Sequence, residues 1–381
     1  MGSSRTALVV TPSLEAYGSD LQMLQSVAGL LDAGWRVVVA ASAPGRLSDR
    51  LIQLGATIEE LDFPVLRRAN ASGAGVAALA ITALRSMPRL VRLIRRTRPD
   101  VLYVNTVTLP WWLAAGRLAR VPTVCHVHEA EARDSPAVRR ALTMPLLLAT
   151  SVIANSRTTE ATLLDAVPRL GSRIRRVSNG VEAPDREPTP PAMQPPIRLT
   201  VVGRLSPRKA PEVALEAAAL LRARGYDVIL DLVGTPVAGM EWFEEQLLTR
   251  AARPDLAGAV TFSGYASPIW PALDRSDIVL APSLGESFGN AVVEGQLARR
   301  PVVATALQGH LETIIDEETG LLVPSENPEA LAAAVSRLLD EPDLASRLAA
   351  RGRESALRDF SQSRYRDEIC AVLSDMITSD D

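Results

Sequence analysis

Short apolar runs that alternate with helical stretches constrain the fold of this 381-residue chain more than any other feature. In the first half, strand-like runs occupy residues 6–10, 36–41, 101–104, 123–127, 152–154 and 174–177. In the second half, they occupy residues 197–202, 228–233, 260–262, 278–281, 302–304 and 321–323. Continuous apolar strands separated by helices are typical of parallel sheets covered on both faces. The pattern therefore predicts an α/β protein with two doubly wound domains.

A proline-rich segment separates the two sets of strands. Residues 182–196 contain six prolines, which can neither donate to a sheet ladder nor continue a helix. Such a composition is typical of an interdomain linker, and a chain of this length exceeds the usual size of one hydrophobic core. We expect a first domain at 1–183, a linker at 184–196, a second domain at 197–360 and a terminal helical segment at 361–381.

Composition excludes several classes of protein. The two cysteines, Cys125 and Cys370, lie far apart, which fits a reducing compartment and gives no disulfide framework. No apolar run approaches the roughly 20 residues that span a bilayer, and the N-terminus lacks the apolar core of a signal peptide. We therefore expect a cytoplasmic protein. The net charge of −3 combines +8 over residues 1–183 with −11 over the remainder, so the two halves are built for different electrostatic surroundings.

The chain contains 40 arginines and a single lysine, Lys209, which follows Gly203 and Arg204 in the segment Val-Val-Gly-Arg-Leu-Ser-Pro-Arg-Lys. A lysine ammonium is a compact charge on a flexible stem and can follow phosphate oxygens. The expected strand at 197–202 breaks at Gly203, and a helix is expected from 211 to 224. A strand–loop–helix junction of this kind offers backbone N–H groups to an anion. The segment predicts a phosphate site.

A second segment, Glu286-Ser-Phe-Gly-Asn-Ala-Val-Val-Glu294, follows the expected strand at 278–281. The two glutamates are eight residues apart, so a helix that begins near Ser287 places both on one side of a site. Glu294 can accept hydrogen bonds from a vicinal diol such as a ribose. The backbone N–H groups of the first turn come from Ser287, Phe288, Gly289 and Asn290. Alone, the pattern also fits two glutamates on a solvated helix face.

Taken together, these segments resemble the GT-B glycosyltransferases, and within them the large retaining family called GT4. The features that match this family are Gly203-Arg204…Lys209, the E-x7-E pair Glu286 and Glu294, and Ala304-Thr…Gly309…Glu312…Gly320-Leu-Leu-Val-Pro324. Landmarks in the first domain are Val127-His128-Glu129, Ala154-Asn155-Ser156 and Ser178-Asn179-Gly180-Val181. The resemblance covers essentially the whole chain. It implies two Rossmann-like domains that face a cleft, with a C-terminal helix at 362–377 that returns to the first domain.

The resemblance also implies roles for individual residues. Arg204 and Lys209 would bind the donor diphosphate, Glu286 would contact the transferred sugar, and Glu294 would hold the ribose. The other expected donor-site residues are Gly18, Gly203, Gly264, Tyr265, Ser287, Phe288, Gly289 and Asn290. In one place the chain departs from the family, whose first loop commonly carries Gly-Gly followed by a glutamate. This chain has Tyr17-Gly18-Ser19-Asp20 there, which leaves acceptor geometry and sugar choice at this loop open.

The expected chemistry is transfer of a hexose-type sugar from a nucleotide diphosphate, UDP- or GDP-linked, with retention of anomeric configuration. Arg204, Lys209 and the helix N-terminus would place positive potential where charge develops on the leaving phosphate. The chain contains no Asp-x-Asp triplet, so we expect neither a metal nor another cofactor. A pseudo-glycosyltransferase, a nucleotide-sugar epimerase and a degenerate donor-binding module are the alternatives on the same fold.

Three histidines and one cysteine are candidates for roles near the site. His128 ends the expected strand at 123–127, and the resemblance places it beside the transferred sugar as a catalytic-site hydrogen-bond donor. A satisfied histidine at a strand end is the alternative. We expect His126 to be structural and Cys125 to be a small buried apolar residue. His310, beside Gly309, lies near the expected sugar site without an assigned role.

The expected acceptor is a glycan, a lipid-linked sugar or a small alcohol. The candidate acceptor residues are Tyr17, Ser19, Asp20, Asn105, Trp111, Arg89 and Arg92. Residues 84–98 predict an amphipathic helix whose outer face carries Arg85, Arg89, Arg92 and Arg96. This face is either solvated or touches an anionic membrane or a lipid pyrophosphate. Nucleic acid is not expected, because no aromatic residues interleave with the arginines. Trp111 and Trp112 either line an acceptor groove or belong to the core.

Overall fold

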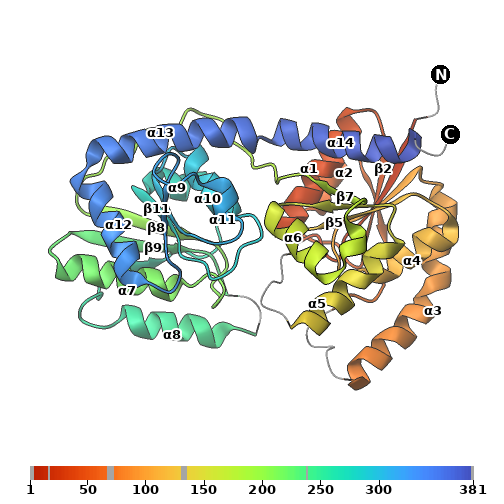
Figure 1. Ribbon diagram of the computed structural model, residues 1–381, viewed down its shortest axis with the longest axis horizontal. Helices are drawn as coiled ribbons and strands as arrows, with labels where there is room; N and C mark the ends of the chain where they lie inside the picture. The colour runs from red at the N-terminus through yellow and green to blue at the C-terminus, as the bar shows by residue number, and fades with distance from the viewer. Residues whose placement is uncertain (1–3, 16–17, 67–72, 130–134, 237–238, 379–381) are drawn as a thin grey trace. The chain divides into compact units, whose positions relative to one another are not determined.

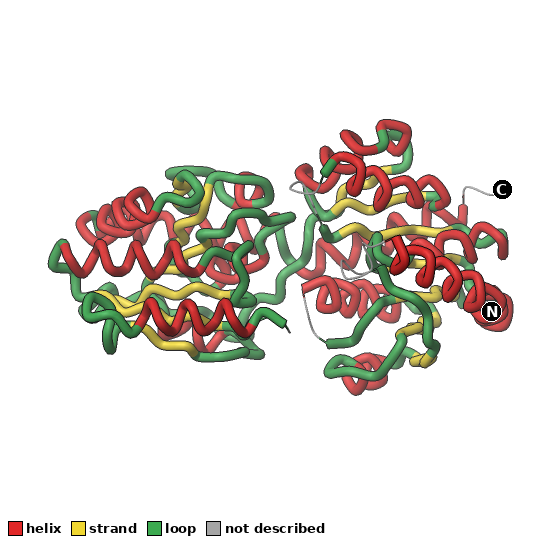
Figure 2. Tube along the Cα trace, turned by 90° about the horizontal axis from the view of Figure 1, so that it is seen from below, coloured by secondary structure: helices red, strands yellow, loops and turns green. Residues whose placement is uncertain are grey.

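The computed structural model describes residues 4–15, 18–66, 73–129, 135–236 and 239–378 (Figure 1). The chain divides into two compact units. Unit 1 comprises Met1–Gly180 and Gln362–Asp381, and unit 2 comprises Val181–Ser361. In each unit the strands lie between layers of helices (Figure 2). The prediction of an α/β fold with two parallel sheets is confirmed.

The described part of unit 1 contains a seven-stranded parallel sheet in the order β3-β2-β1-β4-β5-β6-β7. Its strands are β1 (Thr6–Val10), β2 (Arg36–Ala41), β3 (Thr57–Glu60), β4 (Val101–Val104), β5 (Thr123–Val127), β6 (Ser151–Ala154) and β7 (Ile174–Arg176). β3 was not predicted from the sequence, and its residues Thr-Ile-Glu-Glu are partly exposed. An edge strand is paired on one side only and need not be apolar throughout, so it lacks the continuous pattern that identified the others.

Helices cover both faces of this sheet. They are α1 (Gly18–Asp32), α2 (Ser48–Leu54), α3 (Gly73–Thr97), α4 (Pro110–Ala119), α5 (Pro136–Thr143), α6 (Arg157–Ala166) and α14 (Gln362–Thr378), with 3₁₀ turns η2 (Met144–Leu148) and η3 (Pro168–Leu170). α3 begins at Gly73, well before the arginine-rich stretch that predicted it, and contains Pro88 in its interior.

The C-terminal helix α14 packs against α1, as predicted (Figure 1). Tyr365 of α14 is fully buried. Its hydroxyl lies 2.7 Å from the Ser26 hydroxyl and donates to the Gln22 carbonyl at 3.1 Å. The Gln22 side chain in turn bonds both the N–H and the carbonyl of Gly180. These bonds hold together three segments of unit 1 that are far apart in sequence.

Unit 2 contains, in its described part, a six-stranded parallel sheet in the order β10-β9-β8-β11-β12-β13. Its strands are β8 (Ile197–Val202), β9 (Val228–Val233), β10 (Val260–Phe262), β11 (Ile278–Ala281), β12 (Val302–Thr305) and β13 (Leu321–Val323). Its helices are α7 (Pro211–Ala223), α8 (Glu241–Ala251), α9 (Trp270–Arg275), α10 (Asn290–Leu297), α11 (His310–Thr313), α12 (Pro328–Asp340) and α13 (Pro342–Asp359).

The strand order of unit 2 positions the candidate site. β8, β11 and β12 are adjacent in the sheet, although β9 and β10 separate β8 from β11 along the chain. Because all three strands are parallel, their carboxyl ends meet at one edge. The loops that leave this edge carry Gly203 to Lys209, Glu286 to Gly289, and His310. Ligands of open α/β sheets bind at such an edge.

Replacing Tyr365 with phenylalanine tests how far the α1–α14 contact stabilises unit 1. The ring would stay buried, but Ser26 and the Gln22 carbonyl would lose their shared partner, at a cost of about 1–2 kcal/mol. Urea unfolding should therefore show a free energy of unfolding lower by this amount. Tyr226→Phe is the control, because the Tyr226 hydroxyl bonds Asp340 at the surface and its loss should cost under about 0.5 kcal/mol. If the two changes lowered the free energy of unfolding equally, the Tyr365 hydroxyl would not stabilise the contact between α1 and α14.

Candidate functional site

The loop after β8 brings Lys209 back beside Gly203. Gly203 has a φ of 145°, and a Cβ added there would lie 3.4 Å from Lys209 Cε. Gly234, after β9, has a φ of 155°, and a Cβ there would lie 1.8 Å from the Gly203 carbonyl oxygen. Only glycine tolerates such an approach. The close packing of these two loops keeps the Lys209 stem against the end of the sheet.

Lys209 and Glu286 form an ion pair. The two side chains are only 18% and 11% exposed, respectively. Burial alone would raise the pKa of Glu286, but the positive charges of Lys209 and Arg208 outweigh it and lower this pKa to about 2. Glu286 is therefore a carboxylate at any physiological pH.

Backbone contacts between two loops hold Glu286 in place. Its N–H donates to Gln308 Oε1 at 2.7 Å. Its carbonyl accepts from the Gly309 N–H at 2.9 Å. Gly309 must be small, because a Cβ there would lie 2.5 Å from the backbone of Phe288. The loops that follow β11 and β12 therefore form one rigid piece at the carboxyl edge of the sheet.

Helix α10 begins at Asn290, three residues later than predicted from the sequence. Gly289 precedes it with a φ of 102° and provides no side-chain cap. This left-handed conformation ends the loop and prevents an earlier helix start. Phe288 is buried and packs edge-to-face on Phe360 at 5.3 Å, so its side chain belongs to the core. Ser287, expected at the donor site, is also buried.

Glu294 lies on the second turn of α10 and is half-buried. Burial raises its pKa to about 7, against the opposing effect of Lys209. Glu286 and Glu294 thus share the field of one ammonium group but differ in protonation: the first is ionised, and the second is close to half-protonated at neutral pH.

His310 is the site residue whose role the sequence left unassigned. It begins the short helix α11, is 1% exposed and faces Glu286 and Lys209. With these two residues, Gly289 and Ala291, it lines a cavity of about 10 Å³. Burial lowers the pKa of His310 to about 4, so its ring is neutral. His310 reaches the site because β11 and β12 are neighbours in the sheet. The sequence could have predicted this position only if it had also given the strand order.

The remaining donor-site candidates of unit 2 lie on loops. Arg204 directly follows Gly203 and is exposed. Gly264 has a φ of 69°, and the neighbouring Tyr265 is 49% exposed. Both follow β10, the edge strand, which is separated from β8 by β9.

In unit 1, a chain of hydrogen bonds determines where His128 carries its proton. Asn105 Nδ2 donates to the Ser19 carbonyl at 3.1 Å, so Asn105 Oδ1 is an acceptor. His128 Nε2 lies 3.0 Å from that oxygen and must therefore donate. Burial lowers the pKa of His128 to about 3, so Nδ1 is unprotonated, and it is buried without a partner among the described residues. The free nitrogen is thus an acceptor, in place of the donor that the resemblance implied.

The other first-domain candidates lie in different surroundings. Asp20 is buried and accepts a hydrogen bond from Ser13 at 2.9 Å. Trp112 is fully buried against Phe63, whereas Trp111 is half-buried at the edge of the same core. Arg89 and Arg92 are exposed on α3, Gly18 begins α1, and Tyr17 lies outside the described residues.

His126 and Cys125 belong to the core of unit 1. His126 is fully buried and its Nδ1 lies 2.6 Å from the Tyr103 hydroxyl. Its ring lies 4.0 Å from that of His128. Cys125 is buried, as predicted.

Within the described ranges, no group of three or more His, Cys, Asp or Glu side chains could hold a metal ion. No helix in the same part of the chain has the length and apolarity to cross a membrane.

The two doubly wound parallel sheets, with the last helix returning to the first, define a protein of the GT-B fold. Anabaena HepE, solved with UDP and glucose, aligns at a TM-score of 0.83 and 22% identity over 97% of this chain and 99% of that one. Sucrose-phosphate synthase of Thermosynechococcus elongatus aligns at 0.80 and 21% over 98% and 100%. At these identities the likeness shows the fold alone.

Family models match both units. The model described as Glycosyltransferase Family 4 matches residues 18–185, and that described as Glycosyl transferases group 1 matches residues 196–341. The chain belongs to glycosyltransferase family 4.

Curated relatives match parts of the chain. D-inositol 3-phosphate glycosyltransferase of Salinispora tropica is 35% identical over 46% of this chain and 38% of its own length. Alpha-D-kanosaminyltransferase of Streptomyces kanamyceticus is 32% identical over 45% and 44%. The chain spans about half the length, or less, of the curated relatives it matches.

The raised pKa of Glu294 predicts a pH-dependent stability. Its folded-state pKa of about 7 lies above the ordinary value of 4.5, so its contribution is fully present below pH 4.5 and is lost as the pH rises through 7. Relative to Glu294→Gln, the wild type should lose about 2 kcal/mol of unfolding free energy between pH 4.5 and 8, somewhat less than full linkage because Glu294 is half-buried. Urea unfolding at several pH values measures this difference, and parallel curves for the two proteins would contradict it.

Proposed function

We propose that this protein is a retaining, metal-independent glycosyltransferase that moves a hexose-type sugar from a nucleotide diphosphate to a hydroxyl acceptor. The observation that carries the proposal is the convergence of the single lysine, Lys209, with Glu286 and Glu294 at the carboxyl edge of one parallel sheet. The N-terminal end of α10 lies between the two glutamates in sequence. One ammonium, two carboxylates in different protonation states and a helix end suit a ligand that carries both phosphates and hydroxyls.

In the proposed reaction, the bond between the anomeric carbon and the diphosphate oxygen breaks, and a bond to the acceptor oxygen forms on the same face. The acceptor proton passes to the departing phosphate. Lys209 and Arg204 stabilise the negative charge that develops there, and one such positioned donor contributes about 3 kcal/mol. Glu286 is a permanent carboxylate and can accept from sugar hydroxyls or offset positive charge at the anomeric carbon.

We propose UDP as the donor nucleotide. The structural relative from Anabaena was solved with UDP and with UDP-glucose, which supports a uridine donor for a chain of the same fold. Glu294 is the residue proposed to hold the ribose, through a carboxylate that accepts from both of its hydroxyls.

The acceptor is proposed to be a hydroxyl of a glycan, a lipid-linked sugar or a small alcohol. The relative named for inositol 3-phosphate supports an acceptor that carries hydroxyl groups. The buried acceptor nitrogen of His128, with Asn105 behind it, is the first-domain group proposed to meet a sugar hydroxyl.

A thermal-shift panel of nucleotide diphosphates and nucleotide sugars, with and without Mg²⁺, tests the donor site. UDP and one UDP-sugar should raise the melting temperature equally in both conditions, since ligand that binds only the folded protein stabilises it. A stabilisation that needs Mg²⁺ would contradict metal independence. No response to any nucleotide would overturn the donor site.

Once the panel identifies a donor, Lys209→Ala should lower turnover of that donor at least about a hundredfold, since an uncompensated phosphate charge raises the barrier. Lys209→Arg tests whether a compact charge is required. Arg224→Ala, at an exposed position after α7, is the control and should leave turnover unchanged.

We further propose that the protein works at the cytoplasmic face of an anionic membrane, which it touches through α3. This helix buries Leu90, Leu93 and Ile94 against unit 1. Its outer face exposes Arg85, Arg89 and Arg92. Leu84 on the same helix is 73% exposed. Arginines beside exposed apolar side chains are typical of surfaces that rest on anionic lipid.

Co-sedimentation with vesicles tests this contact. Reversing the charges of Arg85, Arg89 and Arg92 to glutamate should weaken binding to vesicles of phosphatidylcholine with about one third phosphatidylglycerol by at least tenfold, at roughly 1 kcal/mol per arginine. The same reversal at Arg224, Arg253 and Arg275, exposed in unit 2, is the matched control. Equal loss in both variants, or no binding by the wild type, would overturn the proposal.

A further inference from the structure

We infer that His310 is a specificity residue that recognises one hydroxyl group of the transferred sugar, with its Nε2 atom as the hydrogen-bond acceptor. The inference rests on the donor site proposed above and adds to it a residue that neither the E-x7-E pair nor the glycine–arginine–lysine segment contains.

The hydrogen bonds of Nδ1 determine where the proton of His310 lies. Nδ1 is 3.1 Å from the Thr305 carbonyl oxygen and 3.2 Å from the Thr305 hydroxyl. The carbonyl can only accept, and the hydroxyl already donates to the Ser283 carbonyl at 2.7 Å. Both partners are therefore acceptors, so Nδ1 carries the proton of the neutral ring. Nε2 is left with a lone pair, and no described residue donates to it.

The Nε2 edge of the ring lies against the N-terminal end of α10. A Cβ added to Gly289 would lie 2.9 Å from His310 Cδ2, 3.5 Å from Nε2 and 3.6 Å from Glu286 Cγ. His310, Glu286 and Lys209 also line the same small cavity. The neutral Nε2 atom of His310 and the anionic carboxylate of Glu286 are thus two hydrogen-bond acceptors that lie side by side next to Lys209.

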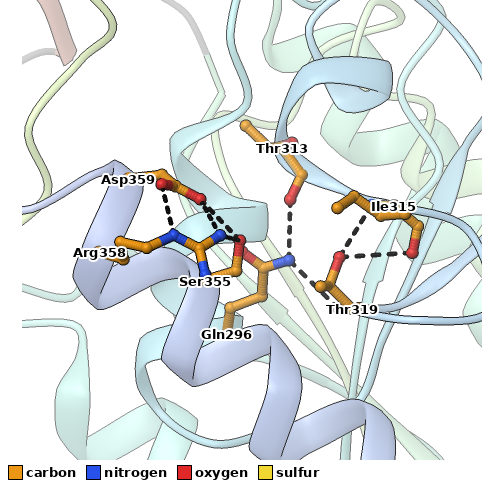
Figure 3. A network of polar contacts seen from close by, with 7 residues as sticks. All are labelled: Gln296, Thr313, Ile315, Thr319, Ser355, Arg358 and Asp359. Atoms are coloured by element: carbon orange, nitrogen blue, oxygen red, sulfur yellow. Dashed lines mark hydrogen bonds and ion pairs between the residues drawn. The ribbon is translucent and has the colours of Figure 1, made fainter.

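Buried hydrogen bonds hold the helix that carries His310 in position. Gln296 of α10 is fully buried, and its Nε2 donates to the Thr313 carbonyl at 2.9 Å and the Thr319 carbonyl at 3.2 Å (Figure 3). Thr319 also accepts from the Ile315 N–H at 2.8 Å. α11 is thereby tied to α10 at its far end, while Thr305 holds the ring at its near end. Thr305 fixes the ring and Gln296 fixes the helix that carries it, so the ring can discriminate between ligands, because it cannot turn to compensate for a missing partner.

The chemistry of Nε2 decides which part of a nucleotide sugar it can meet. An unprotonated nitrogen cannot bond a phosphate oxygen, because both are acceptors. The hydroxyl groups of the ribose are assigned to Glu294, which lies on the second turn of α10, whereas the His310 ring lies against Gly289 at the N-terminal end of that helix. The remaining donors near the diphosphate are the hydroxyl groups of the sugar. Together, His310 and Glu286 suit two neighbouring sugar hydroxyls.

The test compares binding of UDP, UDP-glucose and the four monodeoxy analogues of UDP-glucose to the wild type, His310→Leu and His310→Gln. Leucine removes the acceptor, whereas the glutamine amide oxygen can replace it. UDP should bind all three proteins equally. UDP-glucose should bind His310→Leu about tenfold more weakly, with partial recovery in His310→Gln. Leu311→Gln, an exposed position on the same helix, is the matched control.

One analogue should identify the hydroxyl. The wild type should bind this analogue more weakly than UDP-glucose, by about the same factor as His310→Leu weakens the binding of UDP-glucose. The same analogue should lose nothing further in the leucine variant, because the interaction is already absent. Additive losses for every analogue, or an equal loss of UDP and UDP-glucose in His310→Leu, would overturn the role of His310. Failure of the wild type to bind UDP would instead overturn the donor site itself.

Discussion

The ion pair between Lys209 and Glu286 is the interaction on which the rest of the candidate site depends. Both side chains are largely removed from solvent, and an uncompensated charge in such a place would be costly. The nearby charges of Lys209 and Arg208 lower the pKa of Glu286 to about 2, whereas burial raises the pKa of Glu294 to about 7 despite the opposing effect of Lys209. The ion pair at Glu286 and the burial of Glu294 thereby give the two carboxyl groups different protonation states at neutral pH.

Backbone geometry makes this pair possible. The loops after β8, β11 and β12 converge because their strands are neighbours in a parallel sheet. Close approach needs glycine in two places: Gly234, after β9, lies against Gly203, and Gly309, after β12, lies against Phe288. Without the contact between Gly234 and Gly203, the loop that carries Lys209 could move into solvent. Without the contact between Gly309 and Phe288, the loop that carries Glu286 could do the same. The precision of the site thus comes from backbone contacts as much as from the charged groups.

Much of the fold could be predicted because buried parallel strands must be apolar along their whole length. The same rule explains the omission of β3, an edge strand that ends in two glutamates. Lys209, Glu286 and Glu294 could be identified from composition and spacing. The start of α10, the core position of Phe288 and the acceptor role of His128 could not. They depend on the φ of Gly289, on the position of Phe360 and on the hydrogen bonds of Asn105.

The sequence by itself determined that the chain forms two parallel α/β sheets and which charged residues stand at the ends of their strands, because strand periodicity and loop position are local properties. Only the tertiary structure decided which of those residues meet. It placed His310 beside Glu286, although 24 positions separate them, and it determined which ring nitrogen of His128 and of His310 carries the proton. The physical reason is that strand order and buried hydrogen bonds are set by packing between segments far apart in the chain, and no local pattern records them.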